Sequence, residues 1–103
     1  MTERLAYKQI APAGVKALGG VYGYIIQSGL SPALVEMVYL RISQIYNCAY
    51  CLDMHTKDAR AIGESEQRLY GLAAWRETPY FSERERAALA FTEAVTLVAD
   101  DHV

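Results

Sequence analysis

The sequence predicts an all-α protein, for three reasons. Helix-start signals recur along the chain at Ser31-Pro32, Ser65 and Ser82, where serine can cap a first turn and proline suits the first helical position. Apolar residues between these signals recur at three- and four-residue intervals, which is the spacing of one helix face. Strand patterns are weak. We therefore expect one compact helical domain over residues 1–103, without internal repeats.

Residues 12–28 should form the first helix. Four glycines in this segment weaken it, since each costs about 1 kcal/mol relative to alanine, and Gly29 is placed to end it. Ser31 and Pro32 start the second helix as its N-cap and first residue. We expect this second helix to bury an apolar side composed of Leu34, Val35, Val38, Tyr39, Ile42, Ile45 and Tyr46.

A third helix should run from Cys48 to about residue 62. Asn47 is a favourable N-cap, because its side chain can accept a hydrogen bond from a free N–H group of the first turn. Gly63 follows as the residue that ends the helix, since glycine adopts the left-handed conformation without a steric penalty. This placement puts Cys48 at the first helical position.

Two more helices are predicted in the remaining sequence. Ser65 caps the fourth, which should reach about residue 76 before Pro79 interrupts the pattern. Ser82 and Glu85 form a capping box that starts the fifth. The final residues follow that helix directly, so we also expect the natural protein to continue with further helices. The fifth helix should bury the apolar stripe Ala87, Phe91, Ala94, Val95 and Val98.

Composition and charge exclude several classes of function. The chain is 52% hydrophobic and 21% charged, which is typical of an ordered globular protein. Its net charge is −2, and its basic residues are scattered, so it lacks the basic patch of a nucleic-acid or membrane-surface binder. The amino-terminal residues form no apolar signal segment, and no apolar run approaches the length of a membrane span. We expect a cytoplasmic protein.

The two cysteines of the chain, Cys48 and Cys51, lie close in sequence to His55. Their spacings of three and four residues place all three side chains on one face of a helix. In a reducing compartment a Cys-x-x-Cys pair is more often catalytic or metal-binding than structural. Backbone N–H groups at the helix start favour a thiolate at Cys48, and His55 can accept the proton of Cys51. We interpret the group as a redox-active dithiol.

Such a dithiol can reduce a hydroperoxide. One thiolate attacks a peroxide oxygen to give a sulfenic acid, and the other thiol condenses with that acid to form a disulfide. Residues three apart on a helix have Cα atoms about 5 Å apart, which a disulfide accepts. An external reductant must then reopen the disulfide. We expect no cofactor and no resident metal ion in this cycle.

A histidine base benefits from a carboxylate partner. Asp53 is close in sequence but should point to another face of the third helix. Glu36 lies in an otherwise apolar stretch, where a lone carboxylate is costly unless it has a partner. The second helix can fold Glu36 over the face that carries the cysteines and His55. A zinc site formed by the same four side chains is an alternative, although no second ligand pair exists elsewhere in the sequence.

The pattern of Glu36, Cys48, Cys51 and His55 resembles the core motif of the alkylhydroperoxidase D family, within the carboxymuconolactone decarboxylase superfamily. Flanking residues 40–45 and 81–90 resemble this family too, and the resemblance extends from about residue 12 to the end. It implies an all-helical fold that forms homo-oligomers, often trimers or hexamers. It also implies peroxidase or disulfide-reductase activity, with an external thiol or disulfide reductant as partner.

The resemblance also implies residue roles. Cys48 and Cys51 would be the redox pair, and Glu36 and His55 a proton relay. We assign the attack on the peroxide to Cys51, because His55 is nearest it; the helix dipole at Cys48 keeps the reverse order open. The family's best-studied members have a second histidine between the cysteines, whereas this chain has Tyr50. Two other functions stay open: a lactone decarboxylase or isomerase, which would not need the cysteines, and a non-enzymatic redox-sensing or zinc-binding module.

Overall fold

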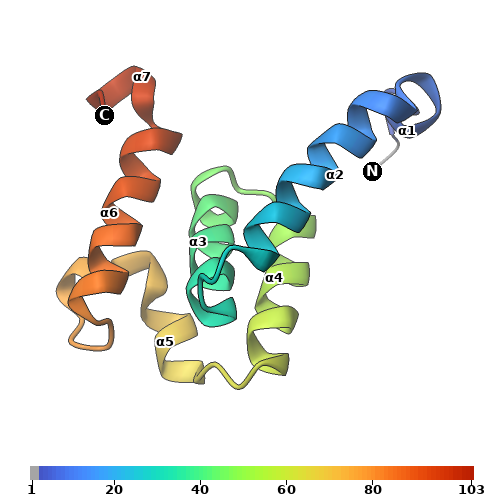
Figure 1. Cartoon of the computed structure of the whole chain (residues 1–103). Helices are drawn as coiled ribbons and strands as arrows, with labels where there is room; N and C mark the ends of the chain where they lie inside the picture. Colours follow the sequence, from blue (N-terminus) through green and yellow to red (C-terminus); the bar gives the residue numbers. More distant parts are fainter. Residues whose placement is uncertain (1–2) are drawn as a thin grey trace. The chain divides into compact units, whose positions relative to one another are not determined.

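The computed structural model describes residues 3–103, and the chain forms two compact units, Met1–Leu30 and Ser31–Val103. Helices are the regular elements of the described residues, which confirms the predicted all-α class (Figure 1). Within residues 3–103, no helix combines the length and the apolar content needed to cross a membrane.

The first unit contains α1 (Tyr7–Ile10) and α2 (Pro12–Gln27). The predicted first helix agrees with α2 to within one residue. Gly29 follows with a φ of 91°, a left-handed conformation that glycine adopts readily, and the helix ends before it as expected. No side chain of α2 is buried.

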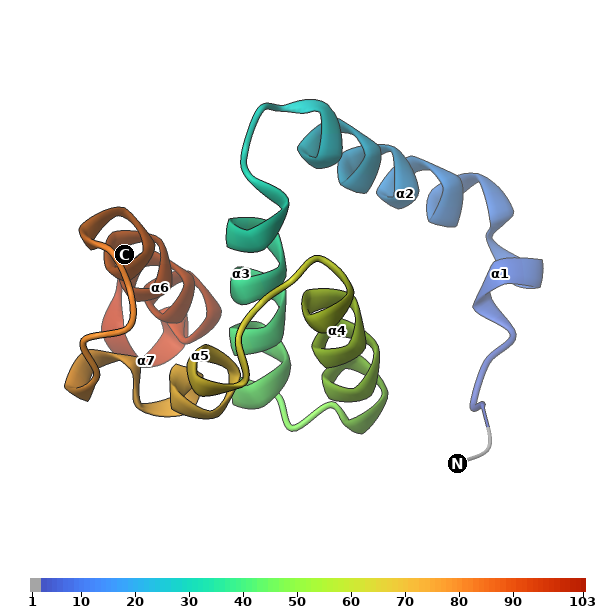
Figure 2. The same cartoon turned by 90° about the horizontal axis from the view of Figure 1, so that it is seen from below.

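The second unit is built around a central helix. It contains α3 (Pro32–Ile45), α4 (Ala49–Ala61), α5 (Glu66–Gly71), the 3-10 helix η1 (Leu72–Glu77), α6 (Glu83–Thr96) and α7 (Val98–Asp101). Helix α3 packs against α4 on one side and α6 on the other, and η1 also contacts it (Figures 1 and 2). A short connection, residues 46–48, turns the chain from α3 into α4. The arrangement therefore holds α3 and α4 side by side.

Serine side chains start three helices at the predicted positions. Ser31 accepts a hydrogen bond from the Leu34 backbone N–H, and Ser65 caps α5 in the same way. Ser82 and Glu85 form the complete capping box at the start of α6. These starts are correctly predicted because a cap depends only on residues within one turn.

The core lies where α3, α4, η1 and α6 meet. Its buried apolar residues are Met37, Leu40, Ala59, Leu69, Leu72, Trp75, Phe81 and Leu89. The predicted buried side of α3 is wrong in part: Leu34, Val35, Val38, Tyr39, Ile42 and Ile45 are only half-buried, and Tyr46 is exposed. Because α3 is packed on two sides, the stripe containing Met37, Leu40 and Ser43 is the one that becomes enclosed.

The predicted buried stripe of α6 is also wrong within this chain. Leu89 and Thr92 are the buried residues of the helix. Ala94 is half-buried, and Ala87, Phe91 and Val95 are exposed. Val98 is exposed too, and it begins the next helix, α7, because α6 ends at Thr96. Positions 87 and 89 differ by about 200° around a helix, so the two stripes point in nearly opposite directions. Helix α6 therefore turns the stripe with Leu89 and Thr92 toward α3 and leaves the longer apolar stripe, with Phe91 and Val95, exposed to solvent.

Glu93 ties α3, η1 and α6 together. Its carboxylate accepts hydrogen bonds from Arg41 Nε at 3.1 Å and from Trp75 Nε1 at 2.9 Å, and also pairs with Arg76. Burial by itself would raise the pKa of Glu93, but the hydrogen bonds from Arg76, Trp75 and Arg41 outweigh it and lower the pKa. Trp75 itself is buried in the core.

Candidate functional site

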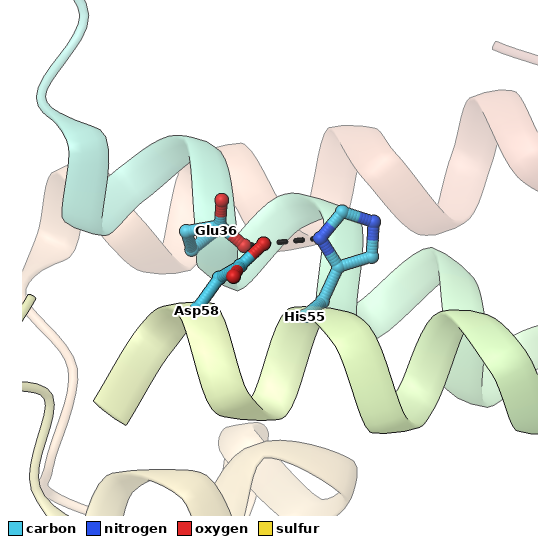
Figure 3. Close-up of side chains that lie close together, drawn as sticks. All are labelled: Glu36, His55 and Asp58. Atoms are coloured by element: carbon cyan, nitrogen blue, oxygen red, sulfur yellow. Dashed lines mark hydrogen bonds and ion pairs between the residues drawn. The ribbon is translucent and has the colours of Figure 1, made fainter. Parts of the chain in front are cut away.

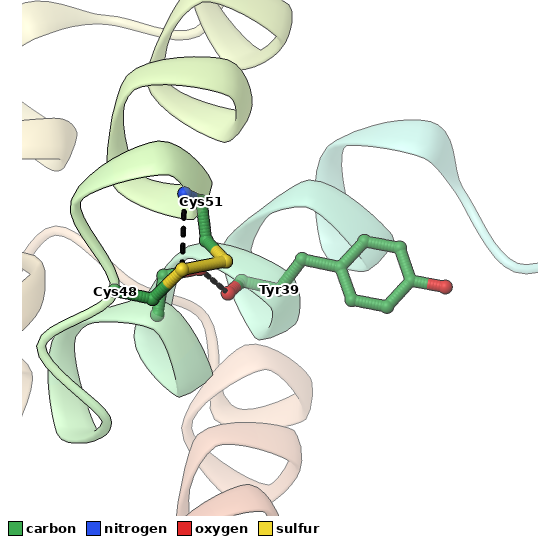
Figure 4. The surroundings of a disulfide bond; sticks show 4 residues. Tyr39, Cys48 and Cys51 are labelled. Carbon is green, nitrogen blue, oxygen red and sulfur yellow. Dashed lines mark hydrogen bonds between the residues drawn. A yellow bond between two sulfur atoms is a disulfide. The ribbon is translucent and has the colours of Figure 1, made fainter. Parts of the chain in front are cut away.

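The two cysteines form a disulfide at the amino-terminal end of α4 (Figure 4). The Cα atoms of Cys48 and Cys51 are 5.2 Å apart, so the bond closes across the first turn without disrupting the helix. Both residues are half-buried. The pair can thus be enclosed by the fold and still be reached from solvent.

The structure corrects the predicted start of this helix. Cys48 itself is the N-cap, and its Sγ accepts a hydrogen bond from the Cys51 backbone N–H at 3.2 Å (Figure 4). Asn47 instead has a φ of 53°, the left-handed conformation that asparagine tolerates between two helices. The Cys48 N–H donates to the Ser43 carbonyl of α3 at 3.1 Å, which anchors the turn. The Cys51 backbone N–H group therefore points directly at the Cys48 sulfur.

Glu36 and His55 form a hydrogen-bonded pair between α3 and α4. Glu36 Oε2 lies 3.0 Å from His55 Nδ1, and the two side chains are only 14% and 16% exposed (Figure 3). His55 follows Cys51 by one turn of α4, so the Glu36–His55 pair lies one turn further along the helix than the disulfide. The structure thus places Glu36 in contact with His55, and His55 lies on the same face of α4 as Cys51.

Two side chains next to this pair are absent from the predicted site. The Tyr39 ring packs on the His55 ring, with centroids 5.0 Å apart, while it extends away from the disulfide (Figure 4). Asp58 projects from α4 beside His55 toward Glu36 (Figure 3). Their spacing in the sequence could have identified them, because residues three apart are neighbours on a helix surface. Tyr39 is three residues after Glu36, and Asp58 is three residues after His55.

Three of these groups converge. One ligand atom each of Glu36, His55 and Asp58 lies within 4.8 Å of the others, and Asp58 is exposed. Among the described residues this is the group of side chains close enough to share a metal ion, and it includes neither cysteine. The alternative zinc site would need both cysteines as free thiolates, whereas their sulfurs are bonded to each other in this structure.

Other candidate residues lie away from the pair. Asp53 binds Lys57, with Oδ2 3.0 Å from Nζ, so it points to another face of α4 as expected. Tyr46 and Tyr50, which flank the disulfide in sequence, are both largely exposed.

A helical hairpin that carries a Cys-x-x-Cys disulfide at one end and a glutamate–histidine pair one turn further defines a class of helical dithiol proteins. The family model of the carboxymuconolactone decarboxylase family matches residues 12–94. The chain therefore belongs to the carboxymuconolactone decarboxylase family, as the motif predicts.

Relatives and a solved structure agree with this assignment. The chain is 43% identical over 103 residues to the uncharacterized protein YdfG of Bacillus subtilis, covering 100% of this chain and 70% of YdfG. It is 34% identical over 71 residues to the uncharacterized protein YnjA of Escherichia coli, covering 69% of this chain and 39% of YnjA.

The crystal structure of ATU0492 from Agrobacterium tumefaciens has the same fold. The TM-score is 0.87 at 38% identity, over 96% of this chain and 68% of that one. ATU0492 is described as a protein of unknown function and a "putative antioxidant defence protein AhpD". The chain thus has an alkylhydroperoxidase D-like fold.

Proposed function

We propose that this protein is a thiol-dependent peroxidase or dithiol oxidoreductase that reduces hydroperoxides through Cys48 and Cys51. The observation that carries the proposal is the placement of the disulfide and the Glu36–His55 pair on one helical hairpin. Reduction of this disulfide would leave the Cys48 sulfur facing the Cys51 backbone N–H group at the helix N-terminus, which stabilises the thiolate. The antioxidant description of ATU0492 is in line with this function.

The reaction follows from these groups. In the reduced protein a thiolate attacks one peroxide oxygen, the O–O bond breaks, and the departing alkoxide takes a proton to become an alcohol. The second thiol then attacks the sulfenic acid, forming the Cys48–Cys51 disulfide and releasing water. His55, held by Glu36, supplies and accepts these protons. An external dithiol reopens the disulfide and is itself oxidised to a disulfide.

The proposal is tested by intact mass. Fully reduced protein is treated with one equivalent of cumene hydroperoxide, and we expect the wild type to lose two hydrogens, a change of about 2 Da that reports an internal disulfide. Cys48→Ser and Cys51→Ser should not show this loss. If the wild-type mass is unchanged and both thiols stay free, the pair is not a peroxidase centre.

The family name points to a second candidate, a lactone decarboxylase or isomerase. Such a reaction does not need the cysteines, so alkylation of both thiols separates the two. Alkylated protein that still converted a carboxylated lactone would favour the decarboxylase. A complete loss of peroxide reduction on alkylation would favour the thiol mechanism.

We also propose that the protein acts as a homo-oligomer. The apolar stripe of α6 supports this, because Phe91 is 62% and Val95 46% exposed, and Val98 at the start of α7 is 50% exposed. Next to it, a groove of about 200 Å³ between α3 and α6 is lined by Val38, Ile42, Phe91, Thr92, Val95 and Thr96. Contiguous apolar surface of this kind marks interfaces, and a second copy of the chain would cover it.

Light scattering after size exclusion tests the oligomer. We expect a mass that is a multiple of 11.5 kDa for the wild type. Phe91→Asp should shift the protein toward a single chain, because a charge would then be buried in the interface. Gln67→Asp adds the same charge at an exposed position of α5 and should leave the mass unchanged. A monomeric wild type would contradict the proposal.

A further inference from the structure

Asp58 is an exposed acidic residue of the site, and the proposed redox cycle gives it no role. Glu36 and His55 are half-buried, whereas Asp58 is exposed and lies one turn beyond His55 on α4 (Figure 3). An atom of each side chain lies within 4.8 Å of the other two. A single water molecule with two hydrogen bonds bridges a gap on the order of 5 Å. Asp58 is therefore positioned between the pair and bulk solvent.

The proposed cycle needs proton exchange with solvent at one step. An external dithiol attacks the disulfide as a thiolate, so its own protons have been released to water. Each protein sulfur that leaves as a thiolate must receive a proton to return to the thiol form. His55 is placed to deliver it, and a histidine that has given up a proton needs a new one before the next turnover.

We propose that Asp58 is the solvent end of this proton relay, passing protons between bulk water and the Glu36–His55 pair. The inference rests on the proposed function. Asp58 acts through Glu36 and His55 and not on the sulfur atoms, so it is a positioning residue of the relay. Asp53, on the same helix, cannot take this role, since it points to another face and binds Lys57.

Asp58 carries two features that suit it to this role. Its carboxylate is exposed, so its proton exchanges freely with water. It faces a second carboxylate, Glu36, across α3 and α4, and a proton held anywhere among the three groups relieves the repulsion between the two acids. The charged and titratable groups that face His55 here are Glu36 from α3 and Asp58 from α4, with the Tyr39 ring beside them.

The test is steady-state turnover of cumene hydroperoxide with dithiothreitol, in the presence of a chelator and at low buffer concentration. We expect Asp58→Asn to lower kcat about 10-fold, less than the 10²–10⁴-fold typical of removing a group that transfers the proton directly. A small buffer such as imidazole should restore kcat as its concentration rises. Asp58→Glu should keep most of the activity, and Asp53→Asn, the matched control, all of it.

Buffer rescue separates the relay from a merely structural role, since a distorted site does not recover when a small acid is added. Unchanged kcat in Asp58→Asn, or a loss that imidazole does not restore, would overturn the inference while leaving the proposed peroxidase intact. Wild-type activity that vanished with the chelator would assign the three side chains to a metal ion and overturn it as well. Wild type inactive without chelator would contradict the proposed function itself, and the relay with it.

Discussion

His55→Ala should lower the second-order rate constant for hydroperoxide reduction by about 10²–10⁴-fold, the usual contribution of a positioned acid–base group. The reason is the hydrogen bond of His55 Nδ1 to Glu36 Oε2 at 3.0 Å, which holds the imidazole on the helix face of Cys51. The measurement is stopped-flow reaction of the reduced protein with cumene hydroperoxide, with disulfide formation followed by quenched mass analysis.

The chain offers a matched control, because its other histidine is His102. His102 is exposed and lies outside the site, so His102→Ala should react like the wild type. Glu36→Gln should fall between the two, since the amide keeps a hydrogen bond but loses the charge. Equal rates for His55→Ala and the wild type would remove the histidine from the mechanism.

Glu85→Gln should destabilise the protein at neutral pH by about 2–3 kcal/mol. This order-of-magnitude figure follows from 1.36 kcal/mol for each unit by which folding lowers the pKa of Glu85. The hydrogen bonds from Arg68 lower the pKa of Glu85 to about 2; burial opposes this shift and the Ser82 backbone N–H adds to it. Arg68 Nη1 donates to Glu85 Oε1 at 3.0 Å and to the Tyr80 carbonyl at 2.8 Å. The pair thus joins α5 to the start of α6.

The sign of the pH dependence follows from the lowered pKa. The ionised carboxylate is favoured by folding, so its contribution to stability is present above the ordinary value of 4.5 and is lost as pH falls toward about 2. Urea unfolding at several pH values should therefore show a steep loss of stability in the wild type over this range. Glu85→Gln should be less stable at pH 7 and show a shallower acid limb.

Glu66, which forms an exposed ion pair with Arg60, provides a control for this prediction. Arg60 lowers the pKa of Glu66 to about 2 as well, but that ion pair is exposed to water. Solvent screening makes exposed pairs worth little to folding. Glu66→Gln should thus change the free energy of unfolding far less than Glu85→Gln does. Equal effects of the two substitutions would show that burial of the Arg68–Glu85 pair contributes nothing.

Local signals predicted much of the fold. The serine caps at Ser31, Ser65 and Ser82 and the glycine after α2 all act within a few residues, and the structure confirms each start and stop. Asn47 is the exception. Asparagine suits both an N-cap and a left-handed turn, and the tight connection from α3 to α4 selects the second, which moves the cap to Cys48.

Burial was predicted less well, because it depends on neighbours that are distant in sequence. Helix α6 has two apolar stripes, and only its packing against α3 decides that Leu89 is enclosed and Phe91 is not. The same holds for α3, which contacts helices on two sides and so buries Met37 and Leu40 between them. Hydrophobic periodicity identifies a helix, but it cannot rank competing faces.

The sequence by itself determined the helical class, the serine-capped starts of α3, α5 and α6, and the common face of Cys51 and His55 on α4. These properties follow from the 3.6-residue period and from capping, both of which act within about two turns. Only the tertiary structure decided that Glu36 meets His55, that Asp58 joins them and that the strong stripe of α6 stays open. Each of those depends on how α3 packs against α4 and α6, which is a contact between segments that local rules do not connect.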